Sequence, residues 1–182
     1  MTSKFLSGFA YPDQRSDMMS LYPYDRRAAV AYAHKWAYGR NPAFYDYEKL
    51  GGDCTNFASQ CVYAGSRVMN YTPTYGWYYI DANDKAPAWT GVPYFYDFMT
   101  RSENSVGPVA VNASIDTIRP GDVIQLSFQN NEWNHTPVVV KVTSPTPSGI
   151  FVAAHSYDAD DRPLSSYQYN DVRYLHFTGV RR

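Results

Sequence analysis

The sequence lacks several features that would each have decided the class of the protein. It has no long apolar run, so nothing predicts a membrane-spanning helix. Its 16 basic and 17 acidic residues give a formal net charge of −1, which argues against a nucleic-acid partner or an acidic membrane surface. With 2 cysteines in 182 residues, it is not a small disulfide-stabilised scaffold. Length and composition therefore predict a single globular domain.

The N-terminal region has no regular hydrophobic period. We expect residues 1–23, which contain Pro12 and Pro23, to form an arm or tail, and residues 24–182 to form one domain. The first ten residues have no continuous apolar segment of the kind found in a secretion signal. Three alternatives remain for where the protein acts: in the cytoplasm, outside the cell after removal of a secretion signal, or outside the cell by another export route.

Helical signals fill the first half of the domain and strand signals fill the second. Asp25 is a predicted N-cap for a helix over 26–38, and a short helix is expected at about 92–101. Short alternating or apolar runs bounded by turn residues follow. This order predicts an α+β fold with an antiparallel sheet. The strands are expected at 123–128, 136–142, 150–155 and 174–177, with turns at 145–149 and 158–163.

A third helix, over 54 to about 65, begins directly after Gly51-Gly52-Asp53. Asp53 is a predicted N-cap, and the apolar positions that follow have the spacing of a buried helix face. Cys54 would then be the first residue of the helix. Free amides and the helix dipole at that end stabilise a thiolate and can receive a developing oxyanion.

Two interpretations of Cys54 are open from the residues alone. It is either an activated nucleophile or a small apolar residue of a core helix. The carboxylate of Asp53 acts against activation, because a neighbouring negative charge raises a thiol pKa. Cys61 lies on the same helix face about 10 Å away, too far for a disulfide, and is expected to be a buried structural thiol.

Two histidines in the second half could complete a site with Cys54. If the strands on either side of the 145–149 turn pair, His135 and His155 lie close to opposite each other. One could then act as a base and the other could orient it. We expect His135 to be the base and His155 the orienting residue.

Aromatic residues are abundant, with 18 tyrosines, 9 phenylalanines and 4 tryptophans. Many fall between residues 66 and 90, which have no clear period. This stretch is either a wall of a substrate groove or a cover for the sheet edge. We expect Trp77 in this stretch, and Trp133 in a loop before His135, to contact substrate.

The segment Asp53-Cys54-Thr55-Asn56-Phe57-Ala58-Ser59-Gln60 resembles the helix that carries the nucleophile in the bacterial putative amidase domain family. That family is similar to CHAP amidases and NlpC-like cell-wall peptidases, relatives of the papain fold. The resemblance covers roughly Tyr24 to the C-terminus. It continues through Gly121–Ile124, His135–Val142 and Ala154–Ser156.

The resemblance implies a papain-like or NlpC-like fold and a hydrolase of amide or peptide bonds in peptidoglycan. It implies the same roles for Cys54, His135 and His155, although papain-like relatives often have Asn, Asp or Glu at the third position. Asp53 and Thr55 would contact the amine of the substrate. Asp158 is a further candidate for substrate binding or for orienting the base. The implied location is extracellular or in the cell wall.

Two other classes of function compete with a cysteine hydrolase. A zinc hydrolase could use Cys54, His135, His155 and Asp158 as ligands. The usual His-x-x-x-His or Cys-x-x-Cys spacing is missing, and a helix N-terminus activates a thiolate without metal, so we expect no cofactor. The other class is a non-catalytic, aromatic-rich module that binds the cell wall. The sequence leaves the scissile bond and the oligomeric state open.

Overall fold

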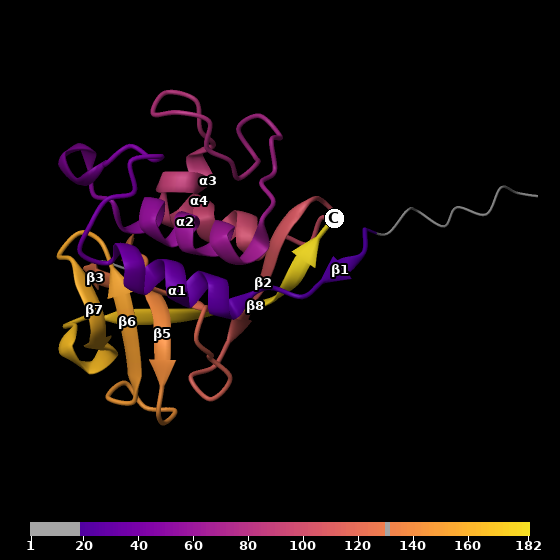
Figure 1. Cartoon of the computed structure of the whole chain (residues 1–182). Coiled ribbons are helices and arrows are strands. Elements are labelled where there is room, and N and C mark those ends of the chain that lie inside the picture. Colours follow the sequence, from indigo (N-terminus) through magenta and orange to yellow (C-terminus); the bar gives the residue numbers. More distant parts are fainter. Residues whose placement is uncertain (1–18, 130–131) are drawn as a thin grey trace, which may run out of the picture.

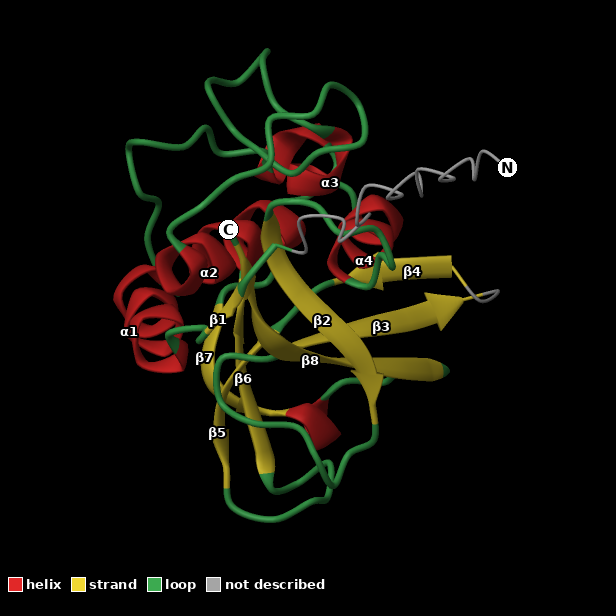
Figure 2. Ribbon diagram, turned by 90° about the vertical axis from the view of Figure 1, so that its right-hand side faces the viewer, coloured by secondary structure: helices red, strands yellow, loops and turns green. Residues whose placement is uncertain are grey.

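The structure, a computed structural model, describes residues 19–129 and 132–182. Within these ranges, eight strands form one antiparallel sheet and the main helices pack together on one side of it (Figures 1 and 2). This confirms the predicted α+β class with an antiparallel sheet. In the described ranges, no helix is both long enough and apolar enough to cross a membrane.

Helices precede most of the strands, as expected. The α-helices are α1 (Arg26–Trp36), α2 (Cys54–Ser66), α3 (Pro87–Thr90) and α4 (Val92–Met99), and short 3-10 turns lie at Glu48–Leu50 and Leu164–Ser166. The strands are β1 (Leu21–Tyr22), β2 (Gly107–Ala113), β3 (Val123–Gln129), β4 (Glu132–His135), β5 (Val138–Val142), β6 (Ile150–Ala154), β7 (Ala159–Pro163) and β8 (Asp171–Arg181).

The first helix begins and packs as its sequence predicts. The side chain of Asp25 accepts a hydrogen bond of 3.0 Å from the amide of Ala28, which is the predicted N-cap. Ala29 and Ala33 are fully buried. These small side chains let α1 lie close to α2, and the amide of Asp25 donates to the carbonyl of Gly65 near the end of α2.

The sheet has the strand order β1-β8-β3-β5-β6-β7, with β2 added on β8 and β4 on β3. A single residue pair, Val123 with Val138, joins β3 to β5. The sheet bends strongly there, so that β3 and β8 run across the direction of β5 and β6 in Figure 2. One half of the sheet thus lies under α1 and the other extends under α4.

Each face of the sheet has its own core. The face under the helices carries a large aromatic cluster in which Trp77 and Trp89 lie 4.9 Å apart, ring centroid to ring centroid. The opposite face carries an aliphatic cluster that the segments around residues 115–118 and 164–174 cover. Its buried members are Ile118, Ile124, Leu126, Val139, Ile150, Val152 and Leu164.

Two stretches expected to be a loop and a turn are strands instead. Residues 132–135 form β4, which pairs with β3, and residues 159–163 form β7 at the edge of the sheet. The strand expected over 136–142 starts only at Val138, because Pro137 has no amide to donate to a neighbouring strand. The last strand is also longer than predicted, since it spans 171–181.

The aromatic stretch over 66–90 is ordered by local pairing. Asn70 and Trp77 form an isolated antiparallel bridge, and Tyr79 and Lys85 form another. The Trp77 ring is fully buried and its Nε1 donates to Ser59 on α2. The inner side of this stretch is therefore part of the core and holds α2 in place.

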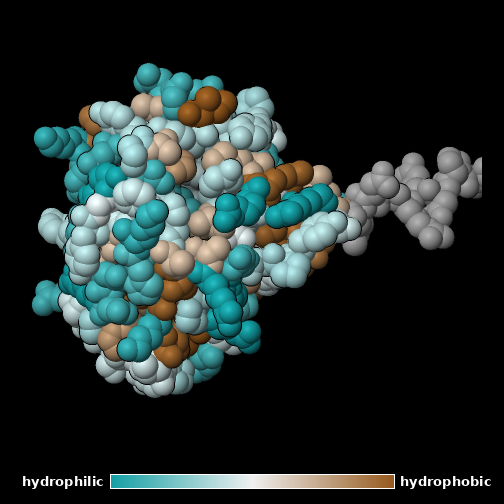
Figure 3. All heavy atoms as spheres, in the orientation of Figure 1, coloured by the Kyte–Doolittle hydropathy of each residue, from teal (hydrophilic) through white to brown (hydrophobic). Residues whose placement is uncertain are grey.

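The predicted N-terminal arm is described only at its end. Residues 1–18 of the arm lie outside the described residues, whereas β1 pairs with the end of β8 through Leu21 with Arg181 and Tyr22 with Val180. In Figure 3, hydrophilic and intermediate residues cover most of the face that α1 and β5–β7 form, and hydrophobic residues occupy separate small areas.

The contact between α1 and α2 gives a test of the fold. A Cβ added at Gly65 would lie 2.8 Å from the carbonyl oxygen of Asp25 and would overlap the ring of Tyr24. We expect Gly65→Ala to lower the free energy of unfolding by about 1–3 kcal/mol. Gly39→Ala is the control, since its Cβ would meet only Trp36, at 3.7 Å. Urea unfolding of both variants measures the difference, and equal stabilities would contradict this account of the helix contact.

Candidate active site

Cys54 is the first residue of α2, as predicted, and 7% of it is exposed. The preceding Gly51 and Gly52 have φ values of 109° and 105°, which residues with a side chain rarely adopt. A Cβ at Gly52 would also lie 3.1 Å from Ser156 Oγ. The two glycines thus turn the chain into α2 while the loop after β6 lies close against it.

Asp53 occupies the N-cap position, but its side chain makes no capping hydrogen bond. One carboxylate oxygen instead accepts from the amide of Tyr47 at 2.9 Å and from Asn56 Nδ2 at 2.8 Å. The other lies 2.5 Å from His155 Nδ1. Asp53 is fully buried, so the expected contact with the amine of a substrate is not available to it.

His155 is held by Asp53 and not by His135. Its Nδ1 faces Asp53 and its Nε2 lies 2.9 Å from the carbonyl oxygen of Trp36. Each ring nitrogen thus faces an acceptor, a carboxylate oxygen on one side and a carbonyl oxygen on the other. The ring also stacks on Phe57 with the centroids 4.0 Å apart. His155 is 1% exposed and has no nitrogen left with which to orient His135.

The predicted strand register is nearly right, but it does not bring the two histidines together. Val138 pairs with Ala153, close to the expected alignment of β5 and β6. His135, however, is on β4, where it pairs with Leu126 of β3. Because the chain breaks at Thr136–Pro137, His135 does not belong to β5, the strand that lies next to β6. The expected contact between His135 and His155 is therefore wrong.

A layer of charged groups covers the Asp53–His155 pair on the outside. Arg40 forms two hydrogen bonds with the carboxylate of Asp158, at 2.9 and 3.0 Å. Its Nε lies 3.7 Å from Asp53. Ser156 Oγ accepts from the Asp53 amide and donates to Glu48. Asp158 thus binds Arg40 on the outside of this cluster and makes no contact with His135.

His135 is buried between two aromatic rings. Its ring centroid lies 6.1 Å from that of Phe128 and 5.5 Å from that of Tyr167, and 5% of the residue is exposed. Among the described residues, its ring has no hydrogen-bond partner. Burial, and secondly the positive charge of Arg162, lowers the pKa of His135 from 6.5 to about 4. The imidazole is therefore neutral at pH 7 and can accept a proton.

Thr136, next to His135, connects this histidine to Cys54. The hydroxyl of Thr136 lies 3.0 Å from that of Thr55, which in turn lies 3.8 Å from Cys54 Sγ. Burial raises the pKa of Cys54 and outweighs the hydrogen bonds that favour the thiolate, which come from the hydroxyl of Thr55 and from the backbone amides of Thr136 and Thr55. The thiol is thus protonated at rest, contrary to the activation expected from the helix end alone. Thr55 is itself buried.

A cavity of about 550 Å³ opens beside His135. Arg162 and Tyr167 form part of its wall, and Arg162 lies over the Tyr167 ring with its Cζ 3.8 Å from the centroid. The hydroxyl of Tyr167 is buried without a hydrogen-bond partner among the described residues. The lining residues are Phe128, Asn134, His135, Ser156, Tyr157, Arg162, Ser166, Tyr167 and Gln168.

The two tryptophans expected to contact substrate lie elsewhere. Trp77 is in the core, where it cannot reach a ligand. Trp133 on β4 is partly exposed and lies under the guanidinium of Arg173, 4.3 Å from Cζ to the ring centroid, outside the lining of the cavity. Aromatic composition alone did not separate core residues from surface residues.

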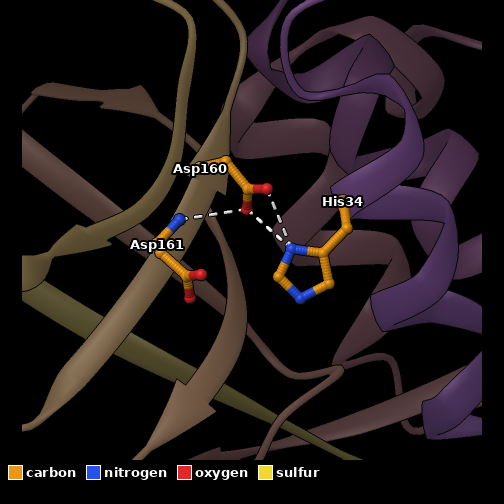
Figure 4. Close-up of side chains that lie close together, drawn as sticks. All are labelled: His34, Asp160 and Asp161. Carbon is orange, nitrogen blue, oxygen red and sulfur yellow. Dashed lines mark hydrogen bonds and ion pairs between the residues drawn. The ribbon is translucent and has the colours of Figure 1, made fainter.

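The four residues considered as zinc ligands are not gathered into one set, because His155 is bound to Asp53 and Asp158 to Arg40. In the described ranges, ligand atoms with metal-site spacing occur at His34, Asp160 and Asp161 (Figure 4). There His34 Nδ1 lies 2.9 Å from both carboxylate oxygens of Asp160. This group lies near the surface, between α1 and β7, and exposed acidic groups of this kind are common without a metal.

Sequence reasoning missed three residues of the site: Thr136, Arg162 and Tyr167. Thr136 could have been noticed as the neighbour of His135. Arg162 and Tyr167 lie in a stretch expected to be a turn and its continuation, and no local pattern relates them to a histidine 27 or more positions earlier. Only the pairing of β6 with β7 brings that stretch to the site.

The structure defines an α+β domain in which a thiol at the start of a helix is linked through Thr55 to Thr136, the neighbour of a buried histidine. Comparison with known proteins identifies the family: residues 23–178 match the family described as "Putative amidase domain", and the chain belongs to it. It is also similar to "Uncharacterized protein YhbB" of Bacillus subtilis (strain 168), with 33% identity over 130 residues, 70% of this chain. The chain spans about 40% of the length of that relative. No solved structure matches.

The buried pair Asp53–His155 gives a testable contrast with an exposed pair. We expect His155→Asn to lower the free energy of unfolding by about 3–5 kcal/mol, because it leaves the buried carboxylate of Asp53 without its partner. His34→Asn removes the more exposed pair with Asp160 and should change it by less than about 1 kcal/mol. Denaturant unfolding at neutral pH compares the two variants. Equal small losses would contradict a structural role for His155.

Proposed function

We propose that this chain is a cysteine-dependent hydrolase of amide bonds, with Cys54 as the nucleophile and His135 as the general base. Membership in the amidase family suggests amide hydrolysis. The observation that carries the cysteine mechanism is the packing of the His135–Thr136 segment against Cys54 at the start of α2. This packing brings the thiol at the start of α2 near the segment that carries the neutral imidazole, and His135 itself lines the cavity.

The pKa directions of the two groups favour general-base catalysis over a resting thiolate–imidazolium pair. Burial raises the pKa of Cys54 and lowers that of His135, so both are neutral before substrate binds. In the first step the sulfur attacks the carbonyl carbon while His135 takes the thiol proton. His135 then gives this proton to the leaving amine as the C–N bond breaks. Water, activated by His135, hydrolyses the thioester and restores the thiol.

The start of α2 is suited to stabilise the tetrahedral intermediate. The side chain of Asp53 does not cap the helix, so the first-turn amides are left for an oxyanion. The Asp53–His155 pair holds the glycine turn in front of them. His135 is oriented in this proposal by packing between Phe128 and Tyr167, in place of the polar third residue of a triad.

The finer assignments rest on sequence resemblance. One is a relationship to papain-like or NlpC-like enzymes. Another is the substrate, which would be bacterial peptidoglycan or a peptide amide. An extracellular or cell-wall location belongs with them. The α+β fold, with the thiol on a helix and the histidine on a strand of the sheet, supports this relationship.

Replacing each cysteine in turn tests the proposal. Cys54→Ala should abolish release of peptides or amino acids from purified peptidoglycan and from acylated peptides, followed by mass spectrometry. Cys61→Ala is the matched control, because Cys61 is fully buried on the same helix. It should keep activity while losing roughly 1–2 kcal/mol of stability. Wild-type turnover by Cys54→Ala would rule out the mechanism.

Thiol alkylation and chelation separate this proposal from its rivals. Iodoacetamide at alkaline pH, where the thiol of Cys54 begins to ionise, should inactivate the protein with adduct formation at Cys54, and EDTA should leave the activity intact. Loss of activity on chelation with recovery on adding zinc would favour a metal hydrolase. Binding to peptidoglycan without any hydrolysis would favour a non-catalytic wall-binding module.

The low pKa of His135 gives a pH test. Protonated His135 cannot take the thiol proton, so kcat/KM should fall as the pH drops through about 4, and not near the usual 6.5. The depressed pKa also makes the free energy of unfolding depend on pH. The neutral ring stabilises the folded state fully above pH 6.5, and this stabilisation is lost as the pH falls from 6.5 through about 4. Rates and unfolding free energies measured from about pH 3 to pH 8 check both effects.

His135→Gln is the comparison for both measurements. The variant should lose nearly as much activity as Cys54→Ala, because the two groups act as a unit. It should also unfold with a weaker dependence on pH in the acid range than the wild type. An acid limb of kcat/KM near pH 6.5 in the wild type would contradict a neutral, buried base.

A further inference from the structure

Arg162 presents an uncompensated positive charge to the cavity beside His135. It is partly exposed, and its guanidinium donates to Ser166 Oγ at 2.8 Å and to the Ser166 carbonyl at 3.3 Å, both of which are neutral acceptors. In the described part of the chain no carboxylate lies within ion-pair distance of it. The other lining residues of the cavity carry no ionised side chain, since the pKa of His135 is too low for it to be charged at pH 7.

The fold around Arg162 fixes where this charge points. On β6 and β7, Val152 pairs with Arg162 and Ala154 with Ala159, so one extra residue of β7 bulges between them. This bulge holds two acidic residues: Asp160 is bound to His34 on α1 (Figure 4), and Asp161, although next to Arg162 in the sequence, forms no ion pair with it. Below the guanidinium, the Tyr167 ring supports it at 3.8 Å from Cζ to centroid.

We propose that this cavity is a binding site for a substrate carboxylate, and that the protein therefore prefers amides that carry a free carboxylate near the scissile bond. Arg162 would bind the carboxylate through its guanidinium, the geometry best suited to carboxylates. A bound anion would also offset the positive charge that disfavours proton uptake by His135. The inference rests on the proposed function, since it names the substrate class of that site.

Binding can be measured without turnover by using the Cys54→Ala variant. The probes are N-acetylalanylalanine and its C-terminal carboxamide, which differ only in the carboxylate. Calorimetry at neutral pH should show that the acid binds about ten- to hundredfold more tightly than the carboxamide. Equal affinities, or no binding of the acid, would overturn the inference.

Second-site variants in the Cys54→Ala background assign the preference to Arg162. Arg162→Gln should bring the ratio of the two affinities close to one. Arg162→Lys, which keeps the charge and loses the planar guanidinium, should retain part of it. Arg27→Gln removes an exposed positive charge on α1 and should leave the ratio unchanged. An unchanged ratio in Arg162→Gln would also overturn the inference.

Turnover by the wild type distinguishes this inference from the proposed function. Amide hydrolysis through Cys54 with equal binding of the two probes would leave the function standing and remove the carboxylate site. Tighter binding of the acid probe by a protein that hydrolyses no amide would support the carboxylate site and remove the proposed function. Hydrolysis that favours the acid probe, with the preference lost in Arg162→Gln, supports both.

Discussion

The site depends on one buried contact, the ion pair between Asp53 and His155. Asp53 is fully buried and His155 nearly so, and together they join the loop before α2 to the end of β6. The ring nitrogen that does not face Asp53 is bound to the end of α1 through Trp36. The Asp53–His155 pair therefore joins three segments, and its longest contact links residues 119 positions apart in the sequence. Such a pair is costly to break, because loss of His155 would leave the carboxylate of Asp53 buried without this partner.

This contact also explains why the start of α2 remains free. A side chain at the N-cap usually occupies the first amides of a helix. Here Asp53 turns away toward Tyr47, Asn56 and His155, and the helix begins without a side-chain cap. The chain exchanges a local stabilising contact for a buried network. The proposed oxyanion site depends on that exchange.

The break between β4 and β5 determines the position of the second reactive group. Pro137 cannot donate to a neighbouring strand, so the chain leaves one pairing at His135 and takes up another at Val138. His135 consequently lies on the β3 side, between Phe128 and Tyr167, with Thr136 directed to Thr55. A continuous strand in the same register would have put His135 opposite Ser156, next to His155, and away from its present aromatic neighbours.

Local signals in the sequence determined the helices and the place of the thiol. Asp25 as a cap, the glycine pair before α2 and the apolar stripe that follows all act over a few residues, so they could be interpreted correctly without the fold. The same holds for the α+β class and for the approximate register of β5 with β6. Only the tertiary structure decided the partners of Asp53 and His155, the burial of Trp77, and the approach of Arg162 and Tyr167 to His135. These features depend on which distant segments pack together in one core. Burial in that core sets the pKa of His135 and decides which charges must pair.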